Sequence, residues 1–194
     1  MYRYFKRFLD IVLSAAGLLV LSPILLIIAV AIKLDSKGPV LFKQKRVAKG
    51  KEHFQILKFR TMYADVPKDV PTHLLADPES KITKIGRFLR KSSLDELPQI
   101  WNILVGEMSI IGPRPALWNQ FDLIAERDKY GANDVRPGLT GLAQVMGRDE
   151  LPIEVKAKYD REYAQNVTLA NDVKIFFKTI TSVLGAKGVK EGKQ

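Results

Sequence analysis

Residues 11–32 read IVLSAAGLLVLSPILLIIAVAI and carry no charged side chain. A run this apolar is hard to bury in one small domain, and as a straight helix it would be about 33 Å long, enough to cross the hydrocarbon of a bilayer. Ser22 and Pro23 stand at its middle. Because proline lacks an N–H and collides with the carbonyl four residues earlier, that of Leu19, we expect the helix to kink or break there.

Basic residues flank the apolar run on both sides: Arg3, Lys6 and Arg7 precede it, and Lys33, Lys37, Lys43, Lys45 and Arg46 follow it. Positive side chains favour the cytoplasmic side of a membrane, and here both ends compete for that side. A re-entrant helix that turns at Ser22-Pro23 and leaves by the face it entered satisfies both ends. A proline-kinked single crossing stays open as the alternative. A cleaved signal peptide is disfavoured because the run is too long and no small-x-small cleavage site follows it.

Length and composition indicate one ordinary globular domain beyond this segment. The chain has 194 residues, a formal net charge of +10 and no cysteine, which excludes disulfides and thiolate metal sites. The excess positive charge predicts an anionic partner, and beside a membrane segment we favour lipid headgroups and phosphorylated ligands over nucleic acid. We divide the chain into a membrane segment at 1–34, a cytosolic domain at 35–186 and a flexible tail at 187–194.

The hydropathy pattern of the domain predicts an α+β fold that is mostly helical, with interfacial amphipathic helices. We expect short strands at 40–42 and 53–62, a short strand or turn at 108–111, a long proline-containing loop at 65–80 and a turn cluster at 133–141. We expect helices at 82–91, from Ser92 to Gly106, and at 117–129, 153–163 and 169–184. The last of these is clearly amphipathic, and it either packs on the domain or lies in the membrane interface.

The adjacent carboxylates of Asp95 and Glu96 are the first candidates for chemistry. They lie between a basic helix and an apolar stripe, close in sequence to Arg87 and Arg90. Two such carboxylates can hold a divalent cation through oxygen ligands, and a carboxylate can attack phosphorus where cations neutralise the phosphate. A purely structural alternative is a capping box, in which Ser93 and Glu96 close the first turn of a helix.

The segment Gly112-Pro113-Arg114-Pro115 is the second candidate. Prolines on both sides of Arg114 fix its backbone, which suits a guanidinium that recognises phosphate in a planar, bidentate manner. A rigid turn with a solvated arginine explains the same pattern.

The weaker candidates are four further basic residues: Lys58, Arg60, Arg136 and Arg148. Lys58 and Arg60 are also explained as residues on the exposed face of a strand. The two histidines, His53 and His73, are better explained as ordinary surface residues. The sequence contains no P-loop, GxGxxG, HExxH, GxSxG or EF-hand pattern.

Several longer motifs follow one another along the chain: KFRTM at 58–62, RKSSLDELPQIWNIL at 90–104, GEMSIIGPRP at 106–115 and VRPGLTGLAQVMGR at 135–148. Together with the Ser22-Pro23 segment, these motifs resemble the small monotopic phosphoglycosyl transferases of bacteria, the bacterial sugar transferase family that initiates glycan assembly on polyprenol phosphate. The resemblance runs essentially end to end. The chain looks like the minimal catalytic form of that family, without a further domain before the core.

The resemblance implies that the domain is catalytic and transfers a sugar phosphate from a UDP-sugar to polyprenol (undecaprenyl) phosphate, with release of UMP. Asp95 is then expected to be the nucleophile that forms a covalent phosphosugar intermediate. Glu96 is expected to assist, either as a base for the acceptor or by supporting a Mg²⁺ ion near both carboxylates. The residues expected to bind or support substrate are Lys58, Arg60, Arg90, Pro113, Arg114, Pro115, Arg148 and Asp160. The loop at 65–80 is expected to shape sugar selectivity.

The expected partners are therefore a UDP-sugar donor, a polyprenol phosphate acceptor and anionic membrane lipids, and not nucleic acid. The oligomeric state stays open, with a homodimer among the alternatives. The expected location is the cytoplasmic face of the bacterial inner membrane, with a monotopic attachment. Two other hypotheses compete: a lipid-phosphate hydrolase that uses the same carboxylate and metal, and a non-catalytic basic module that binds anionic lipid or nucleic acid.

Overall fold

The computed structural model describes residues 2–66, 77–147 and 151–184, and it confirms a mostly helical α+β fold. In chain order the α-helices, strands (β) and short 3-10 helices (η) are α1 (Tyr2–Asp35), β1 (Leu41–Val47), η1 (Lys49–Lys51), β2 (His53–Phe59), α2 (Lys84–Ser92), η3 (Leu94–Glu96), α3 (Gln99–Val105), β3 (Ser109–Ile111), α4 (Phe121–Asp128), η4 (Ala132–Asp134), β4 (Gly138–Thr140), α5 (Leu142–Met146), α6 (Ile153–Gln165) and α7 (Leu169–Leu184).

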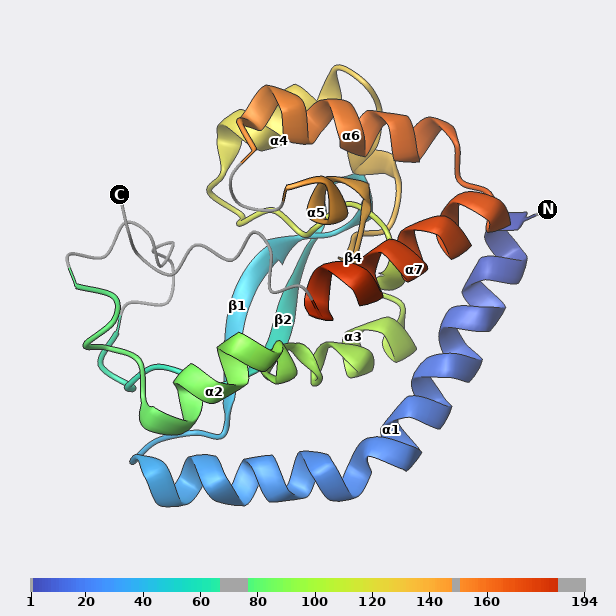
Figure 1. Ribbon diagram of the computed structural model, residues 1–194. Coiled ribbons are helices and arrows are strands. Elements are labelled where there is room, and N and C mark those ends of the chain that lie inside the picture. Colours follow the sequence, from blue (N-terminus) through green and yellow to red (C-terminus); the bar gives the residue numbers. More distant parts are fainter. Residues whose placement is uncertain (1, 67–76, 148–150, 185–194) are drawn as a thin grey trace.

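Helix α1 is continuous but bends sharply near its middle (Figure 1), and Pro23 is the proline inside it. Proline cannot supply the N–H that would bond to the carbonyl of Leu19. The hydroxyl of Ser22 donates to that carbonyl instead, at 2.8 Å. The expected kink is therefore confirmed, and the Ser22 bond explains how the helix bends there without leaving this carbonyl unpaired.

Most apolar side chains of α1 are exposed. Among its aliphatic side chains, the largest exposed fractions are those of Leu34 (83%), Leu19 (78%) and Val20 (72%). The four buried residues of the helix are Asp10, Ser14, Ile28 and Ile32. By length and composition α1 could cross a membrane. An exposed apolar surface of this extent marks an interaction site rather than ordinary protein surface.

Both arms of α1 are nevertheless bonded to the domain. The carboxylate of Asp10 accepts the backbone N–H of Ile110 at 3.0 Å, and that of Asp35 accepts the backbone N–H of Ile85 at 3.1 Å. Figure 1 shows α1 bent around one side of the domain, with α2 and α3 along the inside of the bend and α7 beside its N-terminal arm.

The C-terminal arm of α1 also contributes to the core. Ile28 and Ile32 are buried against Phe59 of β2 and Leu89 of α2. Strands β1 and β2 pair antiparallel from Leu41↔Phe59 to Val47↔His53. The first strand thus runs several residues further than the expected 40–42, and the second ends before the expected Met62.

The parallel pair of β3 and β4 differs from the sequence-based expectation. Its register is Ser109↔Gly138 and Ile111↔Thr140, so the expected turn cluster at 133–141 contains a strand. The two strands approach so closely that a Cβ at Gly138 would lie 2.1 Å from the backbone nitrogen of Gly112. Only glycine fits there, and the contact places the Gly112–Pro115 segment directly after β3.

The remaining helices agree with expectation in varying degree. The bounds of α7 are those predicted, and α6 extends two residues beyond the expected end at Tyr163. Helix α4 is shorter than the predicted 117–129, and α5 was not anticipated. Of the loop expected at 65–80, residues 67–76 lie outside the described part of the chain.

Candidate active site

The two candidate carboxylates lie in a tight connection between α2 and α3. Helix α2 ends at Ser92, and Ser93 takes up the left-handed conformation with φ 57°. Asp95 and Glu96 follow in η3, and Pro98 precedes α3. The capping-box alternative is wrong, because Ser93 forms no side-chain capping bond. A left-handed serine costs roughly 1–3 kcal/mol, and such strain concentrates at functional sites.

Glu96 is held by two cations. One of its oxygens, Oε1, accepts from Lys58 Nζ at 2.7 Å and from Arg114 Nη2 at 2.9 Å. Lys58 comes from β2 and Arg114 from the segment after β3, so three distant parts of the chain meet at one carboxylate. Burial alone would raise the pKa of Glu96, but the two cations reverse this effect and hold that pKa far below its usual range. Glu96 is therefore ionised and paired at neutral pH.

Asp95 differs from its neighbour in its electrostatics. Burial, reinforced by the negative charge of Glu96, raises the pKa of the Asp95 carboxyl, whereas Lys58, Arg90 and Arg114 counteract that rise. Arg90 is held beside the site because its Nε donates to Thr61 Oγ1 at 2.9 Å. Asp95 is thus a partly desolvated carboxylate within electrostatic reach of three cations, which is the setting that a nucleophile for a phosphoryl group requires.

Asp160 affects the site indirectly, through Arg127, a residue that the sequence analysis does not single out. It lies on α6 and forms a buried ion pair with Arg127 of α4, with Nη2 and Oδ2 2.6 Å apart. The same nitrogen of Arg127 donates to the backbone carbonyl of Arg114 at 3.0 Å. Asp160 therefore supports the backbone of a phosphate-binding candidate. A signal for Arg127 was present, because it lies four residues after Leu123, on the same buried helix face.

Pro113 and Pro115 are buried on either side of Arg114. The carbonyl of Pro113 accepts the backbone N–H of Gly138 at 2.8 Å, and the carbonyl of Pro115 accepts from Arg46 Nη1 at 3.0 Å. The backbone is therefore held by hydrogen bonds on both sides of Arg114, which agrees with the rigid backbone that the two prolines predict.

The structure does not bring every candidate to this cluster. Arg60 is 5% exposed, and its guanidinium donates to the carbonyls of Ser36 and Pro39, which fastens the end of α1 to β2. Arg148 lies outside the described residues, as does His73, and His53 is exposed on β2. The structure brings five of the candidates together in one cluster: Asp95, Glu96, Lys58, Arg90 and Arg114.

The donor chemistry of this cluster suits Mg²⁺ only in part. Carboxylate oxygens are ligands that Mg²⁺ prefers, and Asp95 and Glu96 offer them side by side. Within the described ranges, no group of three His, Cys, Asp or Glu side chains could hold a metal ion. Mg²⁺ commonly completes its shell with waters and substrate phosphates. The pair therefore fits an ion shared with a diphosphate and does not form a cage made of protein alone.

Comparison with known proteins connects this geometry to a family. A UDP-glucose:undecaprenyl-phosphate glucose-1-phosphate transferase of Caulobacter vibrioides is 43% identical over 188 residues, which cover 92% of this chain and 69% of that protein. A UDP-N-acetylgalactosamine-undecaprenyl-phosphate N-acetylgalactosaminephosphotransferase of Aeromonas hydrophila is 39% identical over 195 residues, 97% of this chain and 46% of that protein.

A third relative has a different sugar in its name. It is a UDP-galactose-lipid carrier transferase of Erwinia amylovora, 37% identical over 206 residues, which cover 96% of this chain and 42% of that protein. The chain thus spans less than half the length of the Aeromonas and Erwinia relatives. The sequence model of bacterial sugar transferases matches residues 1–186, which include every element described above, and the chain therefore belongs to the bacterial sugar transferase family.

Proposed function

We propose that this protein transfers a sugar phosphate from a UDP-sugar to undecaprenyl phosphate or a similar polyprenol phosphate, and releases UMP. The observation that carries the proposal is the placement of Asp95 in a partly buried turn, within electrostatic reach of Lys58, Arg90 and Arg114. The names of the Caulobacter and Aeromonas relatives supply the donor and acceptor classes. Because the named sugars differ among the relatives, the sugar is left open.

The reaction divides into two balanced steps. In the first, a carboxylate oxygen of Asp95 bonds to the β-phosphorus of the donor, and the bond from that phosphorus to the bridging oxygen breaks. UMP leaves with the bridging oxygen and its electron pair. In the second, a phosphate oxygen of the acceptor attacks the same phosphorus and the Asp95 carboxylate leaves. The product is a polyprenyl-diphosphate-sugar, and neither water nor an oxidant is consumed.

The cations of the cluster would bind the phosphate oxygens of the donor. Lys58, Arg90 and Arg114 offset the charge that builds on these oxygens and on the leaving UMP. A Mg²⁺ ion held by Asp95 and Glu96 together with the donor would add to this neutralisation.

We assign Glu96 as a positioning residue rather than a base. Its pKa is far below the usual range, and one of its oxygens already accepts from both Lys58 and Arg114. A carboxylate with so low a proton affinity is a poor base at neutral pH. Its role is to hold the two cations in the geometry that the donor diphosphate needs.

Glu96→Gln should therefore slow the first step, the labelling of the protein by donor alone, by roughly 100-fold, because both cations lose their anchor. Asp95 must be ionised to attack, so labelling declines as the pH falls through its raised pKa. Loss of the negative charge of Glu96 lowers that pKa, so the acid limb of the pH profile should move to lower pH. Single-turnover labelling across a pH series measures both effects.

The matched control is Glu154→Gln, which removes an exposed carboxylate at the start of α6 and should leave the labelling rate unchanged. A base for the acceptor would behave differently from a positioning residue. Normal labelling of Glu96→Gln by donor alone, with only the transfer to acceptor impaired, would contradict the positioning role.

The proposed location is the cytoplasmic face of the bacterial inner membrane, with α1 as a re-entrant helix. Asp10 and Asp35 stand at either end of the apolar run and both bond to the same domain. A single crossing would separate these two residues by about 30 Å of hydrocarbon, and the domain could not reach both. The bend near Pro23 and the basic flanks support the same arrangement.

Cysteine accessibility tests this arrangement, because the chain has no native cysteine. Single variants Tyr4→Cys and Lys37→Cys should react with a membrane-impermeant maleimide from the same side of the membrane. That side should also label Lys158→Cys, which reports the domain from the exposed surface of α6. Labelling of positions 4 and 37 from opposite sides would establish a crossing helix and overturn the re-entrant proposal.

The direct test of function is UMP release from a panel of UDP-sugars with undecaprenyl phosphate and Mg²⁺. We expect release with at least one UDP-sugar, dependent on the acceptor over many turnovers. Phosphate release from the acceptor without any nucleotide donor would instead identify a lipid-phosphate hydrolase. Salt-sensitive binding to anionic vesicles without turnover of any UDP-sugar would identify a non-catalytic module.

A further inference from the structure

A cavity of about 60 Å³ lies away from the candidate active site, between the first turns of α1 and the segment around β3 and β4. None of Lys58, Asp95, Glu96 and Arg114 lines it. Its lining combines two carboxylates with five basic side chains: Arg3, Lys6, Arg7, Lys49 and Arg136. A cavity needs about 10–15 Å³ of volume to hold one water molecule, so this cavity has room for a small polyatomic ion.

Ser109 of β3 also lines this cavity, and its hydroxyl is unusual. The residue is 1% exposed, and its Oγ has no hydrogen-bond partner among the described residues. Buried hydroxyls nearly always have a partner, because an unpaired one is costly. An orphaned donor in the wall of a basic cavity indicates a ligand atom that accepts a hydrogen bond from it.

Two of the basic side chains are held in place by backbone carbonyls, which carry no net charge and so do not neutralise them. Arg7 donates to the carbonyls of Ile103 and Leu104 at 2.7 and 2.8 Å, and Arg136 Nε donates to the carbonyl of Gly106 at 3.0 Å. Both guanidiniums thus gather at the C-terminus of α3, close enough to repel each other. An anion between them would relieve this repulsion.

The position of the cavity relates it to the membrane surface. Arg3, Lys6 and Arg7 recur at helical spacing, so one face of the first turns of α1 is directed to the cavity. Other positions of the same turns expose aromatic rings, with exposed fractions of 85% for Tyr4 and 59% for Phe8. Aromatic side chains concentrate at the level of lipid headgroups.

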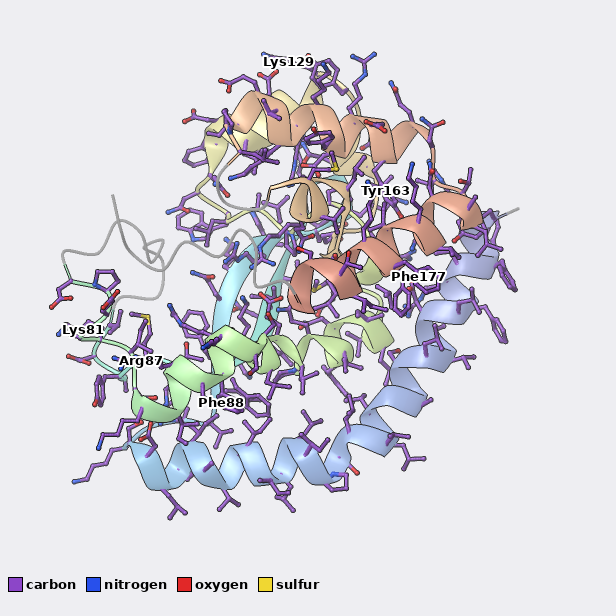
Figure 2. The ribbon with its side chains drawn as sticks, in the orientation of Figure 1. Lys81, Arg87, Phe88, Lys129, Tyr163 and Phe177 are labelled. Atoms are coloured by element: carbon purple, nitrogen blue, oxygen red, sulfur yellow. The ribbon has the colours of Figure 1, made fainter. Side chains whose placement is uncertain are left out.

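Helix α7 extends this surface beside the cavity. Its Asp172 accepts from Lys6 Nζ at 2.7 Å, which joins α7 to the first turns of α1. Phe177, 61% exposed, projects from α7 on the side of the N-terminal arm of α1 (Figure 2). Exposed aromatic side chains therefore stand on α1 and α7, the two helices that meet at Lys6 of the cavity wall, although none of these rings lines the cavity itself.

We propose that this cavity is a second phosphate-binding site, separate from the active site. It accepts the phosphate of an anionic phospholipid headgroup or of a free phosphorylated compound, with Ser109 Oγ and the guanidinium of Arg136 as donors. Occupation would link β3 to the segment before β4 and, through the basic side chains of Arg3 and Arg7, to the first turns of α1, and so stabilise the contact of these turns with the domain.

Thermal unfolding of the full chain in neutral detergent tests the proposal. One arm compares inorganic phosphate with chloride at matched ionic strength, and a second compares mixed micelles containing phosphatidylglycerol with micelles containing phosphatidylcholine. At ten times its dissociation constant, phosphate should raise the Tm of the wild type by roughly 3 to 6 °C. Ser109→Ala should keep or exceed the wild-type Tm without the anion, because an unpaired buried hydroxyl is removed, and should lose the shift.

Arg136→Gln and Arg3→Gln provide two further variants, of which the second changes an exposed side chain and does not threaten folding. The matched control is Lys158→Gln, which removes the same charge from α6, and Arg114→Gln accounts for any anion bound at the active site. Both should retain the shift that the cavity variants lose. UMP release by Ser109→Ala should equal that of the wild type, so this test is independent of the proposed reaction.

Each outcome decides the proposal. A shift with inorganic phosphate that the cavity variants lose identifies a site for free phosphate. A shift with phosphatidylglycerol alone, lost in the same variants, identifies the headgroup as the ligand. Shifts in Ser109→Ala and Arg3→Gln that equal the wild type in both arms, or no shift at all, overturn the proposal.

Discussion

Asp95→Asn should reduce UMP release by roughly a thousandfold or more while leaving the protein folded, because an amide of the same shape is not a nucleophile toward phosphorus. Stability should not suffer. Burial raises the pKa of Asp95 above its unfolded value, so the ionised carboxylate is disfavoured in the folded state as the pH rises. The neutral amide removes that cost, and we expect a Tm at pH 7 equal to or above that of the wild type.

The covalent intermediate gives this prediction its sharpest measurement. Donor labelled in its sugar should attach to the wild type in the absence of acceptor, and subsequent addition of polyprenol phosphate should release the label as lipid product. Asp95→Asn should take up no label. The matched control is Asp122→Asn, an exposed carboxylate in the first turn of α4, which should label as the wild type does. Equal labelling of Asp95→Asn and the wild type would place the nucleophile elsewhere.

Asp160→Asn should have the largest effect on stability. Its partner Arg127 is 6% exposed and would be left as an uncompensated buried charge, which typically costs about 3–5 kcal/mol. For a chain of this length that corresponds to a fall in Tm of roughly 10 °C. Activity should fall as well, because Arg127 also holds the carbonyl of Arg114. Thermal unfolding and single-turnover labelling measure the two effects separately.

A double variant separates packing from positioning. Arg127→Met combined with Asp160→Leu removes both charges, so it should recover much of the lost stability. It should not recover activity, because no donor remains for the carbonyl of Arg114. Recovery of both would make the pair purely structural. As a control, Lys51→Gln breaks an exposed ion pair with Asp128 and should barely change the Tm.

The helices at the two ends of the chain were the parts most open to prediction from sequence. α7 carries a sustained apolar stripe and begins and ends where its periodicity indicates. The uniform apolarity of α1 and its Pro23 predicted a kinked membrane helix, although the helix begins earlier, at Tyr2. β4 was missed because its three residues contain a glycine and show no alternation, and its pairing with β3 comes from tertiary contact alone.

The residues of the candidate site also divide into those that local sequence reveals and those that only the fold reveals. Asp95, Glu96 and Arg114 were identifiable because adjacent carboxylates and a proline-bracketed arginine are locally distinctive. Arg127 offered only its helical spacing from Leu123, which indicates burial but not its role, because that role depends on meeting Asp160 from another helix. Arg60 is the opposite case. It lies close to Lys58 in the sequence, but in the fold it bonds to the carbonyls of Ser36 and Pro39 after α1 and does not join the cluster. Residue type suggests chemistry, whereas the partners of a charge are set by the fold.

The bonds from Tyr2 and Lys6 to Asp172 impose an order on biosynthesis. The partners are separated by 170 and 166 residues, so at about 5–20 residues per second the ribosome needs roughly 8–34 s to supply Asp172 after the first turns of α1 have been made. During that interval the apolar helix has no completed domain to rest against. Under the proposed re-entrant arrangement, α1 would enter the lipid during that interval, and the domain would then form against a helix that is already in place.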